Sequence, residues 1–381
     1  MLSNVVQQMD GKLKIFINAI AALQGGGVTY LNQLLSVIGK DKYVQADVYG
    51  FKKRDASLEE YSNLNFIAVD ETVYTSPIKR FKYEKKVLSN ILKNNNYDIA
   101  FFPSGTINTK VPKHTKSVTM FRNMLPFSDN NIQKFSNFKV KLRYKILKRM
   151  FLKSFKRADH VIFISNFAQS VIAQFIPEIE TKSSVIYHGI NDDFRVERSS
   201  EVNHSLLYVS ILNEYKHQIE IVQGLKKYKD ENGTCPKLRL VGYTSKADYF
   251  NKLQQEILNI GMSDFVEIVG PVEYKKLPEL YKNSEIAIFG STCENCPNIL
   301  LESMATGIPI LCSDAQPMPE FAEDSVIYFN PESPDSFASA LKTIKSTNLV
   351  SLGEKSKKKS KFYNWNKTAE STLGTFLTLS S

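Results

Sequence analysis

Residues 285–314 read EIAIFGSTCENCPNILLESMATGIPILCSD and carry the clearest structural pattern in the chain. An apolar run leads through a polar loop into a stretch with helical spacing, and a second apolar run follows Gly307 and Pro309. The pattern predicts a strand, a loop, a helix opened by Pro297 and Asn298, a glycine stop and another strand, because proline is tolerated in the first turn of a helix and glycine often ends one. This segment is therefore one strand-helix-strand unit.

The same alternation extends over the whole chain. Short apolar, β-rich segments are separated by stretches long enough for helices. They form a first series at 14–20, 46–51, 65–70, 98–104, 117–121, 160–165 and 184–189, and a second series at 206–212, 237–243, 265–271, 285–291, 309–313 and 326–330. Strands this apolar are typical of parallel sheets covered by helices on both faces. The sequence thus predicts an α/β fold of two doubly wound, Rossmann-like domains.

The length of 381 residues fits two domains of about 100 to 200 residues each. Turn residues at 189–193 and a polar stretch at 195–204 separate the two series of strands. We therefore expect domains over residues 1–190 and 191–363, and a closing amphipathic segment over 364–381.

The composition is that of a globular protein with a basic surface. Hydrophobic residues make up 43% and charged residues 23%, which argues against disordered and collagen-like chains. The 49 Lys and Arg residues exceed the 39 Asp and Glu residues, giving a net charge of +10. Such a chain attracts phosphorylated or anionic partners. Because no nucleic-acid recognition motif accompanies the charge, we expect no nucleic acid partner.

The cellular location is inferred from cysteines and apolar runs. Four cysteines are too few for a disulfide scaffold, and no apolar run reaches the roughly 18 to 20 residues of a membrane-spanning helix. Residues 12–27 have two lysines before an apolar run, as a signal peptide does, but a buried first strand leading into a glycine turn accounts for the same residues. The expected location is the cytoplasm, at the inner face of the cell membrane if the chain contacts lipid.

Two glutamates stand out in the 285–314 segment. Glu294 lies in the loop, and Glu302 lies eight residues further on, inside the expected helix. Free backbone N–H groups of Asn298, Ile299 and Leu300 at the helix start would suit a diphosphate. A carboxylate accepts two hydrogen bonds side by side, which suits the vicinal hydroxyls of a ribose or hexose. Together these groups fit a nucleoside diphosphate sugar.

This segment resembles the E-x7-E signature of the retaining glycosyltransferases of family 4, the glycosyl transferases group 1, which have the GT-B fold. Glu294 and Glu302 match the two glutamates, and Gly307 and Pro309 match the turn that follows. The resemblance implies two Rossmann-like domains that face each other across a cleft, the first binding the acceptor and the second the donor. The closing helix, around Trp365, would cross back to the first domain.

The family also implies roles for individual residues. Its first glutamate contacts the donor hexose and its second holds the ribose diol, so these roles pass to Glu294 and Glu302. Members usually have a Gly-Arg pair followed five residues later by a lysine, and the two cations flank the donor diphosphate. Lys216 stands at the lysine position, whereas Ser210 and Ile211 replace the pair. Glu294 and Lys216 are thus the catalytic candidates.

Candidates in the N-terminal half are fewer. Gly26 and Gly27 follow the first strand, and successive glycines allow close backbone approach to a phosphate or sugar, although a tight turn also needs glycine. The family places such a loop over the donor phosphates and acceptor, so both are donor-binding candidates. Where members often carry a His-Asp-like pair, this chain has Arg122 and Asn123, which are acceptor-cleft candidates without an acid or base role.

Two further features admit more than one interpretation. Cys293 and Cys296 form a C-x2-C pair of the kind found in redox and zinc sites, but no second pair accompanies it. The segment 134–157 contains ten Lys and Arg residues, no acidic residue and an apolar stripe at helical spacing. It predicts a basic amphipathic helix that either rests on anionic lipid or packs its stripe on the sheet with a solvated basic face.

The resemblance implies a retaining hexosyltransferase that acts on a saccharide or lipid-linked saccharide in bacterial surface polysaccharide, O-antigen or glycolipid synthesis. No D-x-D triplet occurs in the sequence, so we expect neither a metal ion nor another cofactor. The expected partners are a nucleoside diphosphate sugar, the acceptor and an anionic membrane surface. Two alternatives stay open: a GT-B-like nucleotide-sugar epimerase, and a non-catalytic sugar-nucleotide-binding partner of another transferase.

Overall fold

The computed structural model describes residues 12–23, 25–199, 201–244 and 246–380, which form two compact units. The chain leaves the first unit after Gly189 and returns to it at Asn364. Residues 128–141 belong to the second unit, so the predicted first domain of residues 1–190 is interrupted there. The physical reason is contact within the second unit: the Thr292 hydroxyl donates to the side-chain oxygen of the buried Asn131 at 3.0 Å, and the ring of Phe135 packs against that of His217. A solvent-exposed salt bridge of 2.8 Å between Lys134 and Glu332 adds to it.

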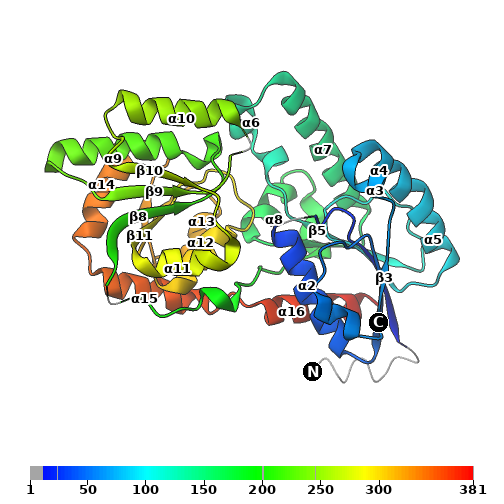
Figure 1. The fold of residues 1–381 in the computed structure, drawn as a ribbon. Coiled ribbons are helices and arrows are strands. Elements are labelled where there is room, and N and C mark those ends of the chain that lie inside the picture. Colours follow the sequence, from blue (N-terminus) through cyan, green and yellow to red (C-terminus); the bar gives the residue numbers. More distant parts are fainter. Residues whose placement is uncertain (1–11, 24, 200, 245, 381) are drawn as a thin grey trace. The chain divides into compact units, whose positions relative to one another are not determined.

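The first unit contains a seven-stranded sheet in which every described strand pair is parallel. Its order is β3-β2-β1-β4-β5-β6-β7 (Figure 1). The strands are β1 Leu13–Asn18, β2 Val44–Tyr49, β3 Leu64–Ile67, β4 Ile99–Phe102, β5 Lys116–Phe121, β6 His160–Phe163 and β7 Ser183–Val185. β1 pairs with β2 and β4, which confirms the strand interpretation of the first apolar run.

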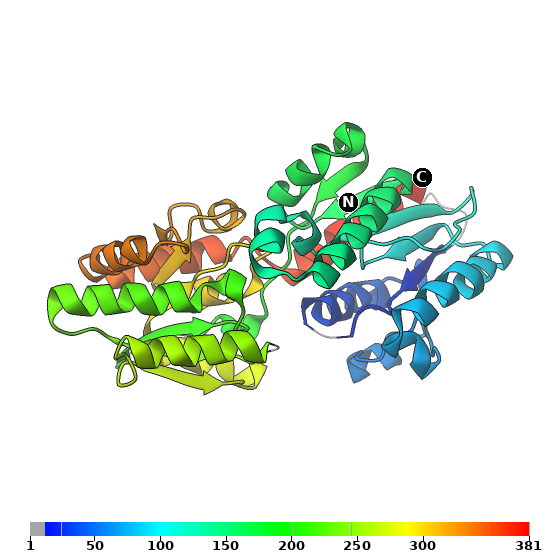
Figure 2. The same ribbon diagram turned by 90° about the horizontal axis from the view of Figure 1, so that it is seen from above.

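Helices flank this sheet on both sides (Figures 1 and 2). They are α2 Gly26–Lys40, α3 Glu71–Thr75, α4 Pro77–Tyr83, α5 Ser89–Asn94, α7 Phe138–Arg157, α8 Asn166–Ala173 and α16 Trp365–Ser380, with short η helices at Ala56–Glu60, Glu84–Leu88, Leu125–Phe127 and Pro177–Lys182. Helix α7 belongs to this unit from Leu142 onward. Phe101 of β4 contacts Phe376 of α16 at a ring distance of 5.1 Å. Phe121 of β5 contacts Phe155 of α7 at 5.4 Å. The closing helix α16 thus packs in the first unit, next to α2.

The second unit contains a six-stranded parallel sheet in the order β10-β9-β8-β11-β12-β13. The strands are β8 Asn203–Val209, β9 Lys237–Val241, β10 Val266–Gly270, β11 Ser284–Phe289, β12 Ile310–Ser313 and β13 Ile327–Phe329. With the seven strands of the first unit, they fall on all the segments predicted from the sequence. The doubly wound α/β fold is therefore confirmed.

The helices of the second unit also lie on both faces of its sheet, with α9, α10 and α14 on one face and α11, α12 and α15 on the other (Figure 1). They are α6 Asp129–Phe135, α9 Gln218–Asn232, α10 Ala247–Asn259, α11 Leu277–Asn283, α12 Asn298–Thr306, α13 Met318–Ala322, α14 Pro334–Lys345 and α15 Leu349–Ser360, with η5 Asp192–Phe194, η6 Glu214–Lys216 and η7 Tyr274–Lys276. Helix α12 ends at Gly307, whose φ of 73° favours glycine and confirms the predicted stop.

The basic segment 134–157 forms the end of α6 and the whole of α7. The second half of its apolar stripe is core, since Phe151 and Phe155 are buried. The first half is not: Phe138 is 79% exposed, and Leu142 and Ile146 are about half exposed, at 48% and 50%. Packing on the sheet therefore accounts for only half of the stripe. None of the helices in the described part of the chain combines the length and apolar character needed to cross a bilayer.

Candidate active site

The sheet of the second unit has a switch point between β8 and β11, because the chain continues from β8 to one side and from β11 to the other. Ligands of open α/β sheets bind outside the carboxyl ends of the strands at such a point. The loops that follow these two strands are joined by hydrogen bonds. The Thr292 N–H donates to the Tyr215 carbonyl at 2.9 Å, and the Gly290 N–H donates to the Tyr208 hydroxyl at the end of β8 at 3.2 Å.

These loops bring Lys216 and Glu294 together. The Lys216 ammonium and the Glu294 carboxylate form an ion pair, with side chains that are 7% and 18% exposed. The rings of Phe289 and Tyr215 lie 5.2 and 5.3 Å from the ammonium. A lysine ammonium has three donors, so it can hold a further anion while it stays paired with Glu294. The two catalytic candidates from the sequence are therefore neighbours.

His217, which no motif in the sequence marks, shapes the loop after Lys216. Its backbone is left-handed, with φ of 54°, a conformation that costs a non-glycine residue about 1 to 3 kcal/mol. Its Nε2 lies 3.0 Å from the Thr292 hydroxyl, which donates at 3.0 Å to the side-chain oxygen of Asn131. These contacts tie the loop of Lys216 to the loop of Glu294. No motif in the sequence marks Asn131. It lies in α6, within residues 1–190, which the sequence pattern assigned to the first domain.

Glu302 projects from α12 into a buried position and is only 8% exposed. The carboxylate therefore lies on a buried face of the helix, not on a solvated one. The Tyr274 hydroxyl donates to its Oε1 at 2.7 Å. Burial raises the pKa of Glu302 from 4.5 to about 7, and the hydrogen bond from Tyr274 opposes part of that rise. Tyr274 was missed from the sequence, although it follows β10 and so lies near a carboxyl end of this sheet.

The raised pKa of Glu302 predicts a pH dependence of stability in the ligand-free protein. Because the folded state holds the proton more tightly than the unfolded state, the stabilisation is complete below pH 4.5 and is lost as the pH rises through 7. Between about pH 5.5 and pH 8 the loss amounts to about 2 kcal/mol. Glu302→Gln does not titrate, so denaturant unfolding should show wild type losing that much stability relative to this variant. A pH-independent difference would contradict the assignment.

The start of α12 partly matches its predicted role. The helix begins at Asn298, as predicted from the sequence. The Asn298 N–H, however, donates to the Cys296 carbonyl at 2.9 Å, so the expectation of a free group there is wrong. The tight turn before the helix causes this contact. For the N–H groups of Ile299 and Leu300, no acceptor is recorded in the part of the chain that the structure describes. These two groups are available to an anion at the helix start.

The candidates of the first unit form a separate group. Gly26 and Gly27 open α2, and a β carbon on Gly27 would lie 2.9 Å from Nη1 of Arg122. The Arg122 guanidinium therefore lies over the start of α2, although a flexible side chain could move aside for a β carbon, so this contact does not itself require glycine. The Asn123 side-chain oxygen accepts from the Leu125 N–H at 3.2 Å and so shapes the loop after β5. The structure thus brings Gly27 and Arg122 together, while their donor and acceptor roles stay predictions.

The two cysteines of the C-x2-C pair lie in the loop between β11 and α12. Cys293 and Cys296 are buried free thiols, and burial raises the pKa of Cys293 to about 12. The protonated thiol is a poor nucleophile in the ligand-free protein. Among the residues that the structure describes, no group of three His, Cys, Asp or Glu side chains is arranged to hold a metal ion.

Two family models match the chain in turn. Residues 24–194 match Glycosyltransferase Family 4, and residues 190–361 match Glycosyl transferases group 1. Together they cover the sequence without a gap from residue 24 to residue 361. The chain belongs to the family 4, group 1 glycosyltransferases, as the E-x7-E segment indicated.

Known proteins agree with this placement. The O-antigen chain mannosyltransferase RfbU of Salmonella typhimurium is 26% identical over 208 residues, which are 55% of this chain and 56% of that protein. The chain spans about half the length of the curated relatives it matches. Anabaena HepE, solved with UDP and glucose, is 17% identical with a TM-score of 0.68 over 95% of this chain and 99% of that chain. A glycosyltransferase from Rickettsia africae is 17% identical, with a TM-score of 0.69 over 97% of this chain and 98% of that chain. The predicted GT-B fold class is confirmed.

Proposed function

We propose that the protein is a retaining glycosyltransferase that moves a hexose from a nucleoside diphosphate sugar to a hydroxyl of a saccharide or lipid-linked saccharide. The observation that carries this proposal is the ion pair of Lys216 with Glu294 at the switch point of the second sheet. A cation and a carboxylate side by side fit the junction at which a sugar is joined to a diphosphate. The bond that breaks in the transfer lies at this junction.

In this proposal each group of the site has one part of the donor to hold. The Glu302 carboxylate accepts hydrogen bonds from the ribose diol, and the N–H groups of Ile299 and Leu300 donate to the diphosphate. Glu294 accepts from hexose hydroxyls. Lys216 offsets the negative charge that grows on the diphosphate as it leaves. Since a buried carboxylate with a pKa near 7 is partly protonated, donor binding should also strengthen from pH 6 to pH 8.

The reaction needs no protein base. The bond between the anomeric carbon and the phosphate oxygen breaks, and the acceptor oxygen attacks the same face of the sugar. The departing phosphate oxygen takes the acceptor proton, so the products are a nucleoside diphosphate and a glycoside with the configuration of the donor. Arg122, beside Gly27, is our candidate for a contact in the acceptor cleft.

The setting that we propose is the synthesis of a bacterial surface polysaccharide, O-antigen or glycolipid in the cytoplasm. Similarity to an O-antigen chain mannosyltransferase supports it, and the basic face of α7 supports contact with the anionic inner face of the membrane. The complex of HepE with UDP and glucose makes UDP-sugars the first donors to test.

Proton NMR of the purified chain with nucleotide sugars tests the proposal. When no acceptor is present, water can take its place, so the enzyme should hydrolyse its donor. We expect slow release of nucleoside diphosphate and of a free hexose that first appears in the donor's anomeric configuration. Appearance of an isomeric sugar nucleotide would indicate an epimerase instead. If a donor binds but no donor is turned over, the protein would be a non-catalytic partner of another transferase. This alternative is suggested by Ile211, which stands where the family usually has arginine.

We further propose that transfer needs no metal ion, since lysine and helix N–H groups supply the positive charge at the diphosphate. The rate of donor hydrolysis should therefore stay unchanged within about twofold in excess EDTA. Loss of the rate in EDTA and its return with added Mg²⁺ or Mn²⁺ would contradict this prediction.

A further inference from the structure

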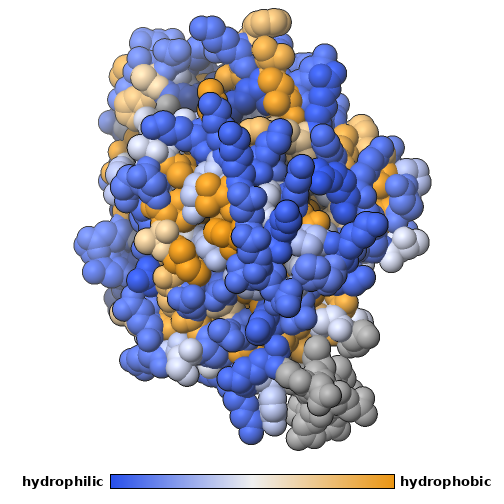
Figure 3. Space-filling model, turned by 90° about the vertical axis from the view of Figure 1, so that its right-hand side faces the viewer, coloured by the Kyte–Doolittle hydropathy of each residue, from blue (hydrophilic) through white to orange (hydrophobic). Residues whose placement is uncertain are grey.

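A groove of about 1000 Å³ runs between α4 and α7 in the first unit. Its apolar lining consists of Pro77, Ile78, Phe81, Ile107, Ile146, Leu147 and Met150. Ligand pockets usually measure about 300 to 1,000 Å³, so this groove is at the large end of that range. Figure 3 looks onto this side of the molecule and shows apolar patches framed by hydrophilic side chains. Ile78 is 69% exposed and Ile146 is 50% exposed, which is unusual for apolar residues that flank a hollow.

The charged residues of the groove are almost all cationic: Arg80, Lys85, Arg143, Lys153 and Arg157. None of them forms a salt bridge with an acidic residue in the described ranges. The single acidic lining residue, Glu84, is buried and accepts hydrogen bonds from Asn18 at 3.1 Å and Asn108 at 2.7 Å. The groove therefore combines an apolar floor with uncompensated positive charge.

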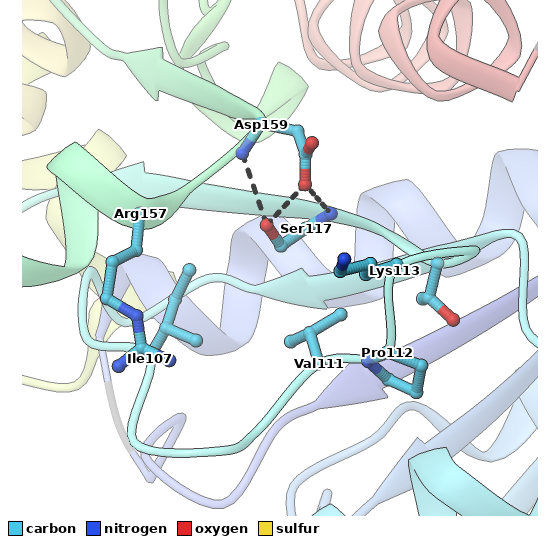
Figure 4. A pocket seen from close by; sticks show the side chains of 8 residues that line it. Ile107, Val111, Pro112, Lys113, Ser117, Arg157 and Asp159 are labelled. Carbon is cyan, nitrogen blue, oxygen red and sulfur yellow. Dashed lines mark hydrogen bonds between the residues drawn. The ribbon is translucent and has the colours of Figure 1, made fainter.

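A second, smaller pocket adjoins the groove, since Ile107 and Arg157 line both. It measures about 390 Å³ and adds Lys113. Figure 4 shows Arg157 beside Ile107, with Asp159 and Ser117 at the strand side. The Asp159 carboxylate accepts hydrogen bonds from the Ser117 N–H and hydroxyl at 2.8 and 2.7 Å, and these bonds hold it against β5. The pocket adds one cation, Lys113, and one anion, Asp159, so it extends the hollow without changing the net positive charge of the groove.

We propose that the groove between α4 and α7 binds a single lipid phosphate, with the alkyl chain on the apolar floor and the phosphate on the arginines. This rests on the proposed function and narrows its acceptor to a saccharide carried by a phosphate-linked lipid. Arginine suits a phosphate because its planar fork donates two parallel hydrogen bonds. One chain fits better than a bilayer surface, because the lining includes Ile107, which is only 6% exposed and lies below the reach of a flat membrane.

The position of the lining residues on α7 supports a built site. Residues 143, 146, 147, 150, 153, 154 and 157 recur every three or four positions and so share one face of the helix. Arg149 is exposed on the same helix and does not line the groove. It provides a matched control for Arg143, with the same side chain and the same net charge change.

The test uses n-dodecyl phosphate below its micelle concentration, titrated into the full chain without donor. The double variant Ile78→Asp with Ile146→Asp and the single variant Arg143→Gln should each bind at least about tenfold more weakly. Arg149→Gln and Val350→Asp, an exposed site in the second unit, should bind within about twofold of wild type. Butyl phosphate, with no long chain, and dodecyl maltoside, with no charge, should bind wild type at least about tenfold more weakly than dodecyl phosphate.

Equal binding by all variants, or no binding by wild type, would overturn the proposal. Vesicles of phosphatidylglycerol distinguish a bilayer contact: if groove variants lose vesicle binding while dodecyl phosphate binding is unchanged, the surface is a membrane contact and the lipid site is rejected. Because the assay contains no donor, Glu302→Ala should bind dodecyl phosphate as wild type does. A failed transfer assay therefore does not affect the test of the lipid phosphate site. A failed dodecyl phosphate titration likewise does not affect the test of glycosyl transfer.

Discussion

Glu302→Ala is expected to weaken binding of the nucleoside diphosphate sugar about 100-fold and to reduce turnover almost to zero. Each hydrogen bond from a ribose hydroxyl to an ionised carboxylate contributes about 1.5 to 3 kcal/mol, and the variant loses two of them. Calorimetric titration measures the first effect and release of nucleoside diphosphate the second. The expected loss is large because Glu302 is buried, where few water molecules compete for its oxygens.

Two neighbouring variants serve as controls for this prediction. Tyr274→Phe removes the hydrogen bond to Glu302 but keeps the carboxylate, so donor affinity should fall by only several-fold. Glu302→Gln keeps the shape of the side chain without the charge and should fall between wild type and alanine. Retained activity in Glu302→Ala, with an unchanged melting temperature, would remove Glu302 from the donor site.

Lys216→Met is expected to lower kcat by about 10² to 10³ at saturating donor, because it removes the charge that stabilises the departing diphosphate. It also leaves Glu294 without its ion-pair partner in a position where the carboxylate is 18% exposed. Loss of one partner from such a pair destabilises a protein, here by about 2 kcal/mol, since Glu294 keeps some contact with water. Single-turnover kinetics and denaturant unfolding measure the two effects.

A double-variant comparison separates catalysis from stability at this pair. Lys216→Met combined with Glu294→Gln removes both charges, so it should recover most of the lost stability. Turnover should stay at the level of Lys216→Met or below, because Glu294 also contacts the hexose. If the double variant recovered turnover together with stability, Lys216 would be a structural residue only.

The fold could be predicted from the sequence because its signal is local and repeated. Several strands, such as β4, β11 and β12, are buried on both faces, and the stretches between the strands are long enough for helices. Each strand-helix unit can therefore be predicted from its own residues. Gly307 is a clear example, since the left-handed helix end at this position favours glycine. The interruption at residues 128–141 was missed because it depends on a contact with residues about 160 to 200 positions away along the chain.

The donor site was predicted in outline for a different reason. The motifs that contain Glu294, Glu302 and Lys216 are short. Their residues are separated only by a loop or by a few turns of one helix, so their spacing can be recognised in the sequence. Tyr274 and His217 were missed because they act through contacts between elements, which spacing within one segment does not report. The free state of the Asn298 N–H was predicted wrongly because the turn at Cys296 depends on backbone angles that the residue types leave open.

The most direct test of the central claim is a calorimetric titration of UDP-, GDP-, ADP- and dTDP-sugars into wild type, Glu302→Ala and Lys216→Met. We expect at least one of these donors to bind wild type, Glu302→Ala to lose about 100-fold in affinity for it, and Lys216→Met to bind it more weakly as well. Binding of every donor with the same affinity by all three proteins, or binding of none by wild type, would show that Glu302 and Lys216 do not form a donor site.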